Sequence, residues 1–221
     1  MKTSQTNTDP TKKNNFSNCP KTDVFARRLD SREDKFRRYT QLAESSKLLS
    51  DFNLLASTMR GNERQMCYEL EFLLKEAGDP EAKVDKTGIR GLVVAKTTLN
   101  PVEAIEKLRA VLGERPYEFR YSLRIIPIQK VVHTNLEEIK ASAAELTAQM
   151  TENETFRVTV EKRFTRIHTK DIIEAVATDV KNKVELEKPD KVLLIETLGG
   201  YTGISLIKPT HMISVLKEKM L

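Results

Sequence analysis

The chain has 221 residues, of which 39% are hydrophobic and 31% charged, and its formal net charge is +5. This composition is typical of a soluble globular protein that is long enough for one large domain or two small ones around a tail. No apolar run approaches the length that crosses a membrane, and the N-terminus lacks the hydrophobic core of a signal peptide, so we expect a cytoplasmic protein. The two cysteines and three histidines do not have the spacing of metal ligands, so we expect no metal centre and no cofactor.

The first 50 residues divide into two parts. Residues 1–22 are mostly Thr, Asn, Lys and Ser, which bury too little apolar surface to offset their ordering entropy, and they predict a disordered tail. Residues 23–50 predict an amphipathic helix, because Phe36, Tyr39 and Leu42 keep helical spacing among many charged residues.

Residues 51–133 alternate strand and helix patterns. In chain order we expect a strand at 52–58, a helix capped by Asn62, a hairpin that turns at 86–88, a strand at 89–96, a helix capped by Asn100, and a strand at 121–128. The resulting order β-α-β-β-α-β is that of a ferredoxin-like subdomain.

Residues 134–221 predict a second α/β unit. In chain order we expect a helix capped by Asn135, a strand from Phe156, a helix capped by Thr169, a strand at 191–196, a hairpin turn at Gly199-Gly200, and a last helix from Thr210. The helix after Thr169 is expected to be long, because Ile172, Val176, Val180 and Val184 recur at every fourth residue.

A basic segment at residues 157–170 runs from the predicted strand at Phe156 to the predicted helix at Thr169. It contains five Lys or Arg residues against one acid, Glu161. Free backbone N–H groups at a helix N-terminus favour anions, so the segment predicts phosphate binding, whereas the simpler interpretation is a solvated loop. The candidate phosphate-binding side chains of this segment are Arg157, Lys162, Arg163, Arg166, His168 and Lys170.

Weaker candidates lie in the ferredoxin-like subdomain. Arg60 and Arg64 flank the first predicted helix start, where two arginines oppose the helix dipole unless an anion is present. Arg124, on the strand at 121–128, is a candidate to line the seam between the two subdomains.

Several of these motifs together resemble the THUMP domain, an RNA-binding module of thiouridine synthases, tRNA methyltransferases and an adaptor for tRNA cytidine acetylation. The resemblance rests on FRVTVEKR at 156–163, the helix opening TKDII at 169–173, VELEKPD at 184–190, and the VLLIE strand at 192–196 with its glycine turn. It implies an α/β fold in which an N-terminal ferredoxin-like subdomain is followed by a THUMP domain.

The sequence contains no GxGxxG loop, no Walker loop, no Cys-x-x-Cys pair and no nucleophile elbow, and the chain ends where THUMP enzymes continue into a catalytic domain. We therefore expect a protein that is not itself an enzyme. By resemblance, it is an adaptor that grips the acceptor end of tRNA and presents the tRNA to a separate tRNA acetyltransferase, with no membrane partner. The alternatives are the RNA-binding subunit of a split thiouridine synthase or methyltransferase, and a ribosome-associated RNA-binding protein.

Overall fold

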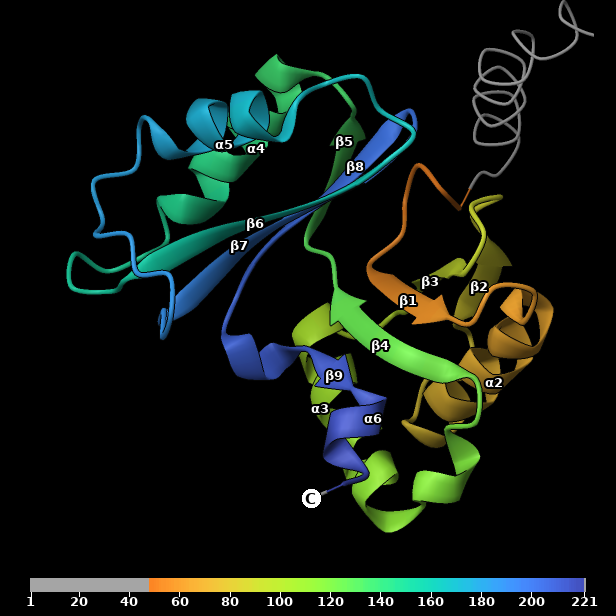
Figure 1. Cartoon of the computed structure of the whole chain (residues 1–221). Helices are drawn as coiled ribbons and strands as arrows, with labels where there is room; N and C mark the ends of the chain where they lie inside the picture. The colour runs from red at the N-terminus through yellow and green to blue at the C-terminus, as the bar shows by residue number, and fades with distance from the viewer. Residues whose placement is uncertain (1–47, 221) are drawn as a thin grey trace, which may run out of the picture. The chain divides into compact units, whose positions relative to one another are not determined.

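The computed structural model describes residues 48–220, whose strands form two sheets (Figure 1). The predicted tail at 1–22 and all but the last three residues of the predicted helix at 23–50 lie outside the described residues.

The first sheet is built from residues of the predicted ferredoxin-like subdomain. Its elements in chain order are β1 (Leu54–Thr58), α2 (Glu63–Glu76), β2 (Lys83–Lys86), β3 (Leu92–Lys96), α3 (Pro101–Glu114), the 3₁₀ turn η1 (Pro116–Glu118) and β4 (Ser122–Pro127). The strand order β2-β3-β1-β4, antiparallel throughout, is the ferredoxin-like arrangement that the sequence predicts.

The second sheet follows without a long linker. Its elements are β5 (Lys130–His133), α4 (Leu136–Thr147), β6 (Phe156–Arg163), α5 (Thr169–Ala177), β7 (Lys191–Leu198) and β8 (Tyr201–Ile207), in the strand order β5-β8-β7-β6. Strands β6 and β7 are parallel and α5 connects them, whereas β7 and β8 form the predicted hairpin around Gly199, where φ is 69°.

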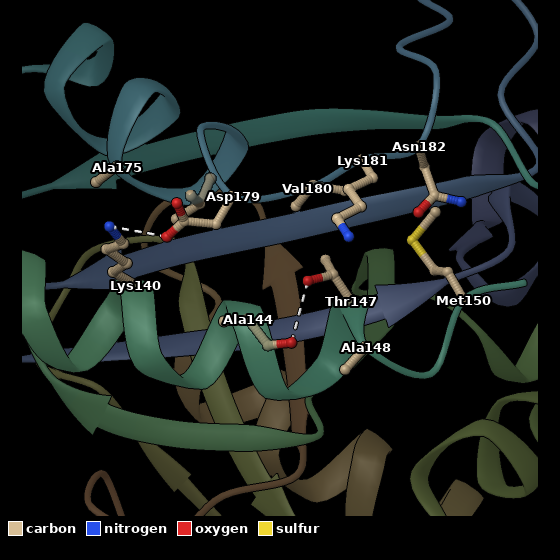
Figure 2. A pocket seen from close by; sticks show the side chains of 11 residues that line it. Lys140, Ala144, Thr147, Ala148, Met150, Ala175, Asp179, Val180, Lys181 and Asn182 are labelled. Carbon is tan, nitrogen blue, oxygen red and sulfur yellow. Dashed lines mark hydrogen bonds and ion pairs between the residues drawn. The ribbon is translucent and has the colours of Figure 1, made fainter. Parts of the chain in front are cut away.

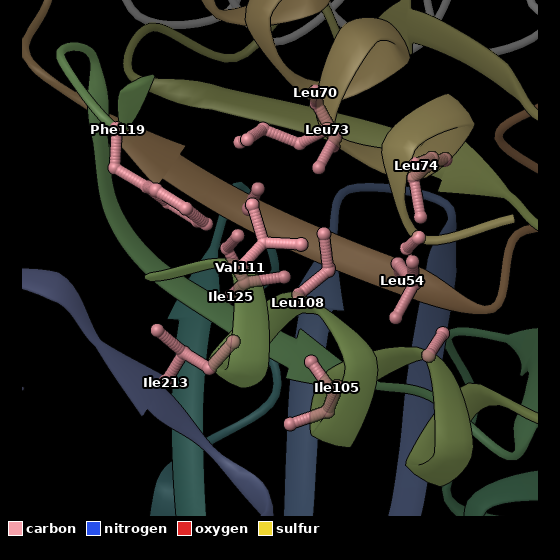
Figure 3. Close-up of a cluster of buried hydrophobic side chains, with 14 of the residues drawn as sticks. Leu54, Leu70, Leu73, Leu74, Ile105, Leu108, Val111, Phe119, Ile125 and Ile213 are labelled. Carbon is pink, nitrogen blue, oxygen red and sulfur yellow. The ribbon is translucent and has the colours of Figure 1, made fainter. Parts of the chain in front are cut away.

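Three clusters of buried side chains hold these layers together. In the first cluster, Leu70, Leu73 and Leu74 of α2 and Ile105 and Leu108 of α3 pack on one face of the first sheet (Figure 3). A cluster on one face of the second sheet joins it to α4 and α5 in the same way. Each fully buried Leu or Ile contributes about 1.5–3 kcal/mol relative to an exposed one, so these clusters dominate the stability of both subdomains.

The remaining cluster contains residues from both sheets. Leu55, Leu92 and Ile126 of the first sheet share it with Leu194 and Leu198 of β7. Because side chains on a strand alternate between faces, each sheet uses one face for its own helices and the other for this shared core. Because β6 pairs with β7, the shared core also fixes the position of β6, which carries the first part of the basic segment, relative to the first sheet.

The helix after residue 168 is shorter than predicted. Helix α5 ends at Ala177, and of the four regularly spaced apolar residues only Ile172 and Val176 are buried within it. Val184 instead forms a parallel bridge with Phe156, and the backbone N–H of Glu185 donates to the carbonyl oxygen of Phe156. Backbone pairing of this extended segment with the start of β6 thus replaces the last predicted helical turns.

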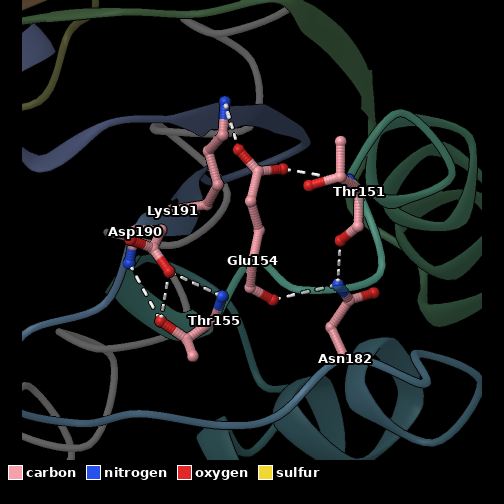
Figure 4. Close-up of polar contacts among 6 residues, drawn as sticks. All are labelled: Thr151, Glu154, Thr155, Asn182, Asp190 and Lys191. Atoms are coloured by element: carbon pink, nitrogen blue, oxygen red, sulfur yellow. Dashed lines mark hydrogen bonds and ion pairs between the residues drawn. The ribbon is translucent and has the colours of Figure 1, made fainter.

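Side chains hold the same connection in place (Figure 4). The Asn182 amide donates to the carbonyl oxygens of Thr151 and Glu154, at 2.7 and 2.9 Å. The Asp190 carboxylate accepts hydrogen bonds from the backbone N–H and the hydroxyl of Thr155, which lower the pKa of Asp190. The loop between α5 and β7 is therefore tied at both ends to the start of β6.

The C-terminal segment also differs from the prediction. A 3₁₀ turn, η2 (Pro209–His211), precedes β9 (Ile213–Ser214), and only Val215–Glu218 is helical (α6). Strand β9 pairs with β4 and adds a fifth strand to the first sheet, while β5 pairs with β8 in the second sheet. Sheet membership therefore crosses the expected division at residues 133/134 in both directions, because β5 pairs with β8 and β9 pairs with β4 across a long stretch of chain.

Candidate nucleic-acid interface

The basic segment turns sharply between β6 and α5. Phe164 has a φ of 57° and is the only non-glycine residue among 48–220 with a positive φ. The Lys162 ammonium donates to the Ile167 carbonyl oxygen at 2.8 Å, and Ile167 packs against the core below α4 and α5. These contacts fix the turn locally, so its side chains are presented on an ordered backbone.

Four candidates of this segment are exposed to solvent. Lys162, Arg166, His168 and Lys170 all lie on the outer surface, and the Lys170 side chain is 83% exposed with only a 3.6 Å ion pair to Glu174. His168, and not the predicted Thr169, is the N-cap of α5, and its side chain forms no capping hydrogen bond. Lys162, Arg166 and Lys170 thus lie within nine residues at the junction of β6 and α5, where the N-cap side chain does not satisfy the helix N–H groups and Asp171 is the one acid of the first turn. The excess of positive charge at a helix start favours an anionic ligand.

Arg157, at the other end of β6, is half-buried and contacts the protein's own backbone. Its Nη1 donates to the carbonyl oxygen of Leu186 at 2.9 Å, and its buried Nε has no hydrogen-bond partner among the described residues. Arg157 therefore holds the loop between α5 and β7 rather than extending the exposed group of cations.

Arg163 points toward the shared core. Its Nη1 donates to the Glu196 carboxylate at 2.7 Å, and Glu196 is only 2% exposed. Burial raises the pKa of Glu196, although the nearby charges of Arg163 and Arg124 act in the opposite direction. Arg163 is thus the partner of a buried carboxylate and can reach a phosphate only if it leaves that carboxylate unpaired.

Arg124 lies at the predicted seam. Together with Arg163 and Glu196 it lines a cavity of about 40 Å³ between the two sheets. Its Nη2 also contacts the Met212 sulfur at 3.1 Å. Arg124 and Arg163 therefore neutralise Glu196 inside the seam instead of forming an outer basic surface.

Arg60 and Arg64 are exposed at the start of α2, and the structure identifies the anion beside them. Oε1 of Glu63 accepts hydrogen bonds from the backbone N–H groups of Gly61 and Gly91, at 3.1 and 2.6 Å. Burial alone would raise the pKa of Glu63, but these hydrogen bonds outweigh it and lower the pKa. The carboxylate at the helix N-terminus is the protein's own, so phosphate is not needed to balance the dipole there.

A cleft between α4 and the end of α5 had no signal in the sequence (Figure 2). Its volume is about 370 Å³, and its lining includes Ala144, Ala148 and Ala175 together with the ion pair of Lys140 and Asp179, at 2.9 Å. Alanines at helical spacing indicate a core-facing stripe, so the sequence alone does not reveal an open cleft.

Two negative findings apply to the part of the chain that the structure describes. Within residues 48–220, no group of three or more His, Cys, Asp or Glu side chains is placed to hold a metal ion. No helix in this range is both long and apolar enough to cross a membrane.

Comparison with known proteins supports the resemblance for part of the chain. Residues 133–207 match the family model of the THUMP domain. A search of curated proteins found no match.

Solved structures with a similar arrangement cover a larger part of the chain. The structure of PH1313 from Pyrococcus horikoshii is 22% identical over 71% of this chain and 55% of its own, with a TM-score of 0.50. TrmN from Thermus thermophilus is 16% identical over 69% of this chain and 44% of its own, with a TM-score of 0.44. A 4-thiouridine synthetase–RNA complex with bound ATP is 15% identical over 72% of this chain and 42% of its own, with a TM-score of 0.42. The chain therefore spans about half the length of these structures, and the likeness to PH1313 shows a shared fold.

Proposed function

We propose, on the premise that residues 133–207 form a THUMP domain, that this chain binds tRNA in support of tRNA modification. The observation that carries the proposal is the family match over a region that includes both β6 and α5. THUMP domains are RNA-binding modules of tRNA-modifying proteins, and here the exposed cations of the basic segment lie within the matched residues.

The chemistry of the site is electrostatic. Lys162, Arg166, His168 and Lys170 surround the N-terminus of α5, where backbone N–H groups and positive side chains act on the same anion. A single strand-to-helix turn is compact, so it holds a few neighbouring phosphates and does not read a long duplex. An unpaired end of tRNA, such as the acceptor end, offers phosphates that can adapt to so small a site.

We further propose that the modification is catalysed by a separate polypeptide, a tRNA cytidine acetyltransferase, and that this chain acts as its RNA-binding adaptor. Support comes from the motifs at residues 156–196, which resemble those of the THUMP adaptor and lie within the residues that match the THUMP domain. The purified chain, incubated with unmodified tRNA and acetyl, methyl and sulfur donors, should yield no modified nucleoside by mass spectrometry. A product formed by the chain alone would show that it is an enzyme.

The test of RNA binding is the salt dependence of tRNA affinity, measured by fluorescence anisotropy for the wild type and the double variant Arg166→Glu, Lys170→Glu. The wild-type affinity should fall linearly with salt on a logarithmic scale, with a slope of about −0.7 to −0.9 for each phosphate contacted. The double variant should bind about tenfold more weakly or worse, with a shallower slope, because it loses charged hydrogen bonds to phosphate.

Lys217→Glu is the matched control, because Lys217 is an exposed lysine of α6 outside the basic segment. It should retain wild-type affinity apart from a small general charge effect. Wild-type binding that is unchanged between low and moderate salt would contradict the proposed phosphate contacts.

A further inference from the structure

The outer face of α2 carries a line of side chains that the proposed tRNA contacts do not use. Arg64, Tyr68 and Phe72 are four residues apart, so they lie next to one another along the helix. Tyr68 is 58% exposed and Phe72 is 41% exposed, whereas Leu70, Leu73 and Leu74 of the same helix point into the core (Figure 3). We call Arg64, Tyr68 and Phe72 the α2 stripe.

Arg64 is held against the first ring of the stripe. Its Nε donates to the Tyr68 hydroxyl at 3.1 Å, and its Cζ lies 5.7 Å from the centre of the Tyr68 ring. Within residues 48–220 the guanidinium forms no ion pair, so its terminal nitrogens are available to an external anion. The stripe thus presents a cation and two aromatic rings in a fixed order.

The positive charges lie at the N-terminal end of the stripe. The Glu63 carboxylate beside them accepts hydrogen bonds from Gly61 and Gly91, and Arg60 and Arg64 are exposed at this end of the helix. Farther along the helix the exposed charges are of both signs: Lys75 accompanies Glu71, and Glu76 forms an ion pair with Arg115 at 2.7 Å.

We propose that the α2 stripe binds unpaired nucleotides of the RNA, with bases stacked on Tyr68 and Phe72 and a phosphate held by Arg64 and Arg60. Aromatic side chains beside cations are how proteins bind single strands without reading sequence. The Cβ atoms of residues four apart on a helix are separated by about 5–6 Å, more than the roughly 3.4 Å rise of a stacked strand. The bases must therefore separate from one another, which an unpaired strand does and a duplex does not. This inference rests on the proposed RNA binding and adds a second contact region to it.

The chain contains no tryptophan, so a single introduced tryptophan reports directly on stacking. Phe72→Trp should be quenched when a short unpaired oligoadenylate or tRNA is added, and much less by an RNA duplex of the same length. Tyr117→Trp is the matched control, because Tyr117 lies in η1 and is 61% exposed, and its fluorescence should stay unchanged.

Affinity gives a second, independent measurement. Tyr68→Leu with Phe72→Leu should weaken tRNA binding by about fivefold or more, since one base stack is worth about 1–3 kcal/mol, while the salt slope stays the same. Tyr117→Leu should bind like the wild type. Circular dichroism and thermal melting should show that the variants fold, because Tyr68, Phe72 and Tyr117 are exposed.

The outcomes separate this inference from the proposed function. If tRNA binds but Phe72→Trp is not quenched and the leucine variant keeps its affinity, the inference is wrong and the RNA-binding proposal stands. The stripe would then be a surface for a protein partner. If the wild type binds no tRNA, the proposed function fails and the inference fails with it.

Discussion

Glu196 shows how a single residue changes the interpretation of the basic segment. Arg163 was a candidate for phosphate binding because it lies within a basic run, but its guanidinium contacts a carboxylate that is buried between the two sheets. The sequence places Glu196 in an apolar strand, VLLIETL, without indicating which residue neutralises it. A buried carboxylate is costly unless it is paired, so the nearest arginine is drawn inward.

The prediction at the residue scale is that Glu196 makes the stability of the folded protein depend on pH. Because burial raises the pKa of folded Glu196, the folded protein holds its proton more tightly than the unfolded chain does. The resulting stability is fully present below the ordinary glutamate pKa of about 4.3 and is lost as pH rises through the higher folded pKa. Glu196→Gln keeps the shape without ionising, so it should gain stability relative to the wild type as pH rises from acid toward neutral.

Urea unfolding of both proteins over this pH range measures the difference. Arg163 is 30% exposed in its side chain, so water can solvate it when Glu196 is replaced. A relative loss of stability by Glu196→Gln with rising pH would mean that Arg163 and Arg124 outweigh burial and hold the pKa of Glu196 low.

At the scale of elements, two asparagines that look alike in the sequence have different roles. Asn100 precedes Pro101, and its side chain accepts hydrogen bonds from the N–H groups of Val102 and Glu103, so it caps α3 as predicted. Asn62 precedes α2 but forms no side-chain capping bond, and its φ of −99° and ψ of 13° lie outside the extended region that a capping residue usually adopts. The neighbouring Glu63 carboxylate accepts hydrogen bonds from Gly61 and Gly91, which lie outside the helix, so it ties the helix start to the loop before β3 without capping α2.

The two asparagines therefore form a matched pair for mutation. Asn100→Ala should lower the free energy of unfolding by about 1 kcal/mol, the usual cost of a lost helix cap. Asn62→Ala should change it by less than about 0.5 kcal/mol, as expected for a surface position without such a contact. Chemical denaturation of both variants gives the comparison, and equal losses would contradict the assigned capping roles.

At the scale of the whole described structure, the shared core fixes how the proposed RNA site is placed relative to the first sheet. Leu55 and Ile126 of the first sheet pack with Leu194 and Leu198 of the second, so the basic segment and the first sheet are held in one arrangement. A fixed arrangement allows the turn before α5 to hold an RNA end while another surface supports the adjoining stem.

The prediction at this scale concerns tRNA that lacks its terminal unpaired nucleotides. If the basic segment binds the acceptor end, Arg166→Glu with Lys170→Glu should weaken the binding of intact tRNA strongly. The same double variant should weaken the binding of trimmed tRNA only slightly, because trimmed tRNA has already lost the nucleotides that these side chains contact. A double-mutant cycle over both proteins and both RNAs measures the coupling, expected at about 1 kcal/mol or more. Equal losses on intact and trimmed tRNA would place the contact elsewhere on the RNA.

Local patterns in the sequence were sufficient for the order of elements from β1 to β4 and from α4 to β8, but not for β5 or β9. Alternation in FRVTV, the capping residues Asn100 and Asn135, and the glycine turn at 199–200 each act over a few residues, so the ferredoxin-like order and the hairpin of the second sheet were predictable. The family match at 133–207 agrees with the resemblance found in those same motifs.

Tertiary structure decided which charges remain exposed and where helices end. The pairing of Val184 with Phe156 ended α5 early, and the burial of Glu196 turned Arg163 inward, while Lys170 a few residues away remained in solvent. The sequence by itself determined where positive charge is concentrated along the chain, because that depends only on the order of the residues. Only the packing of distant segments determined which cations remain exposed to solvent. A buried carboxylate pairs with the nearest cation that the fold supplies, and an unpaired backbone segment forms hydrogen bonds with the nearest strand.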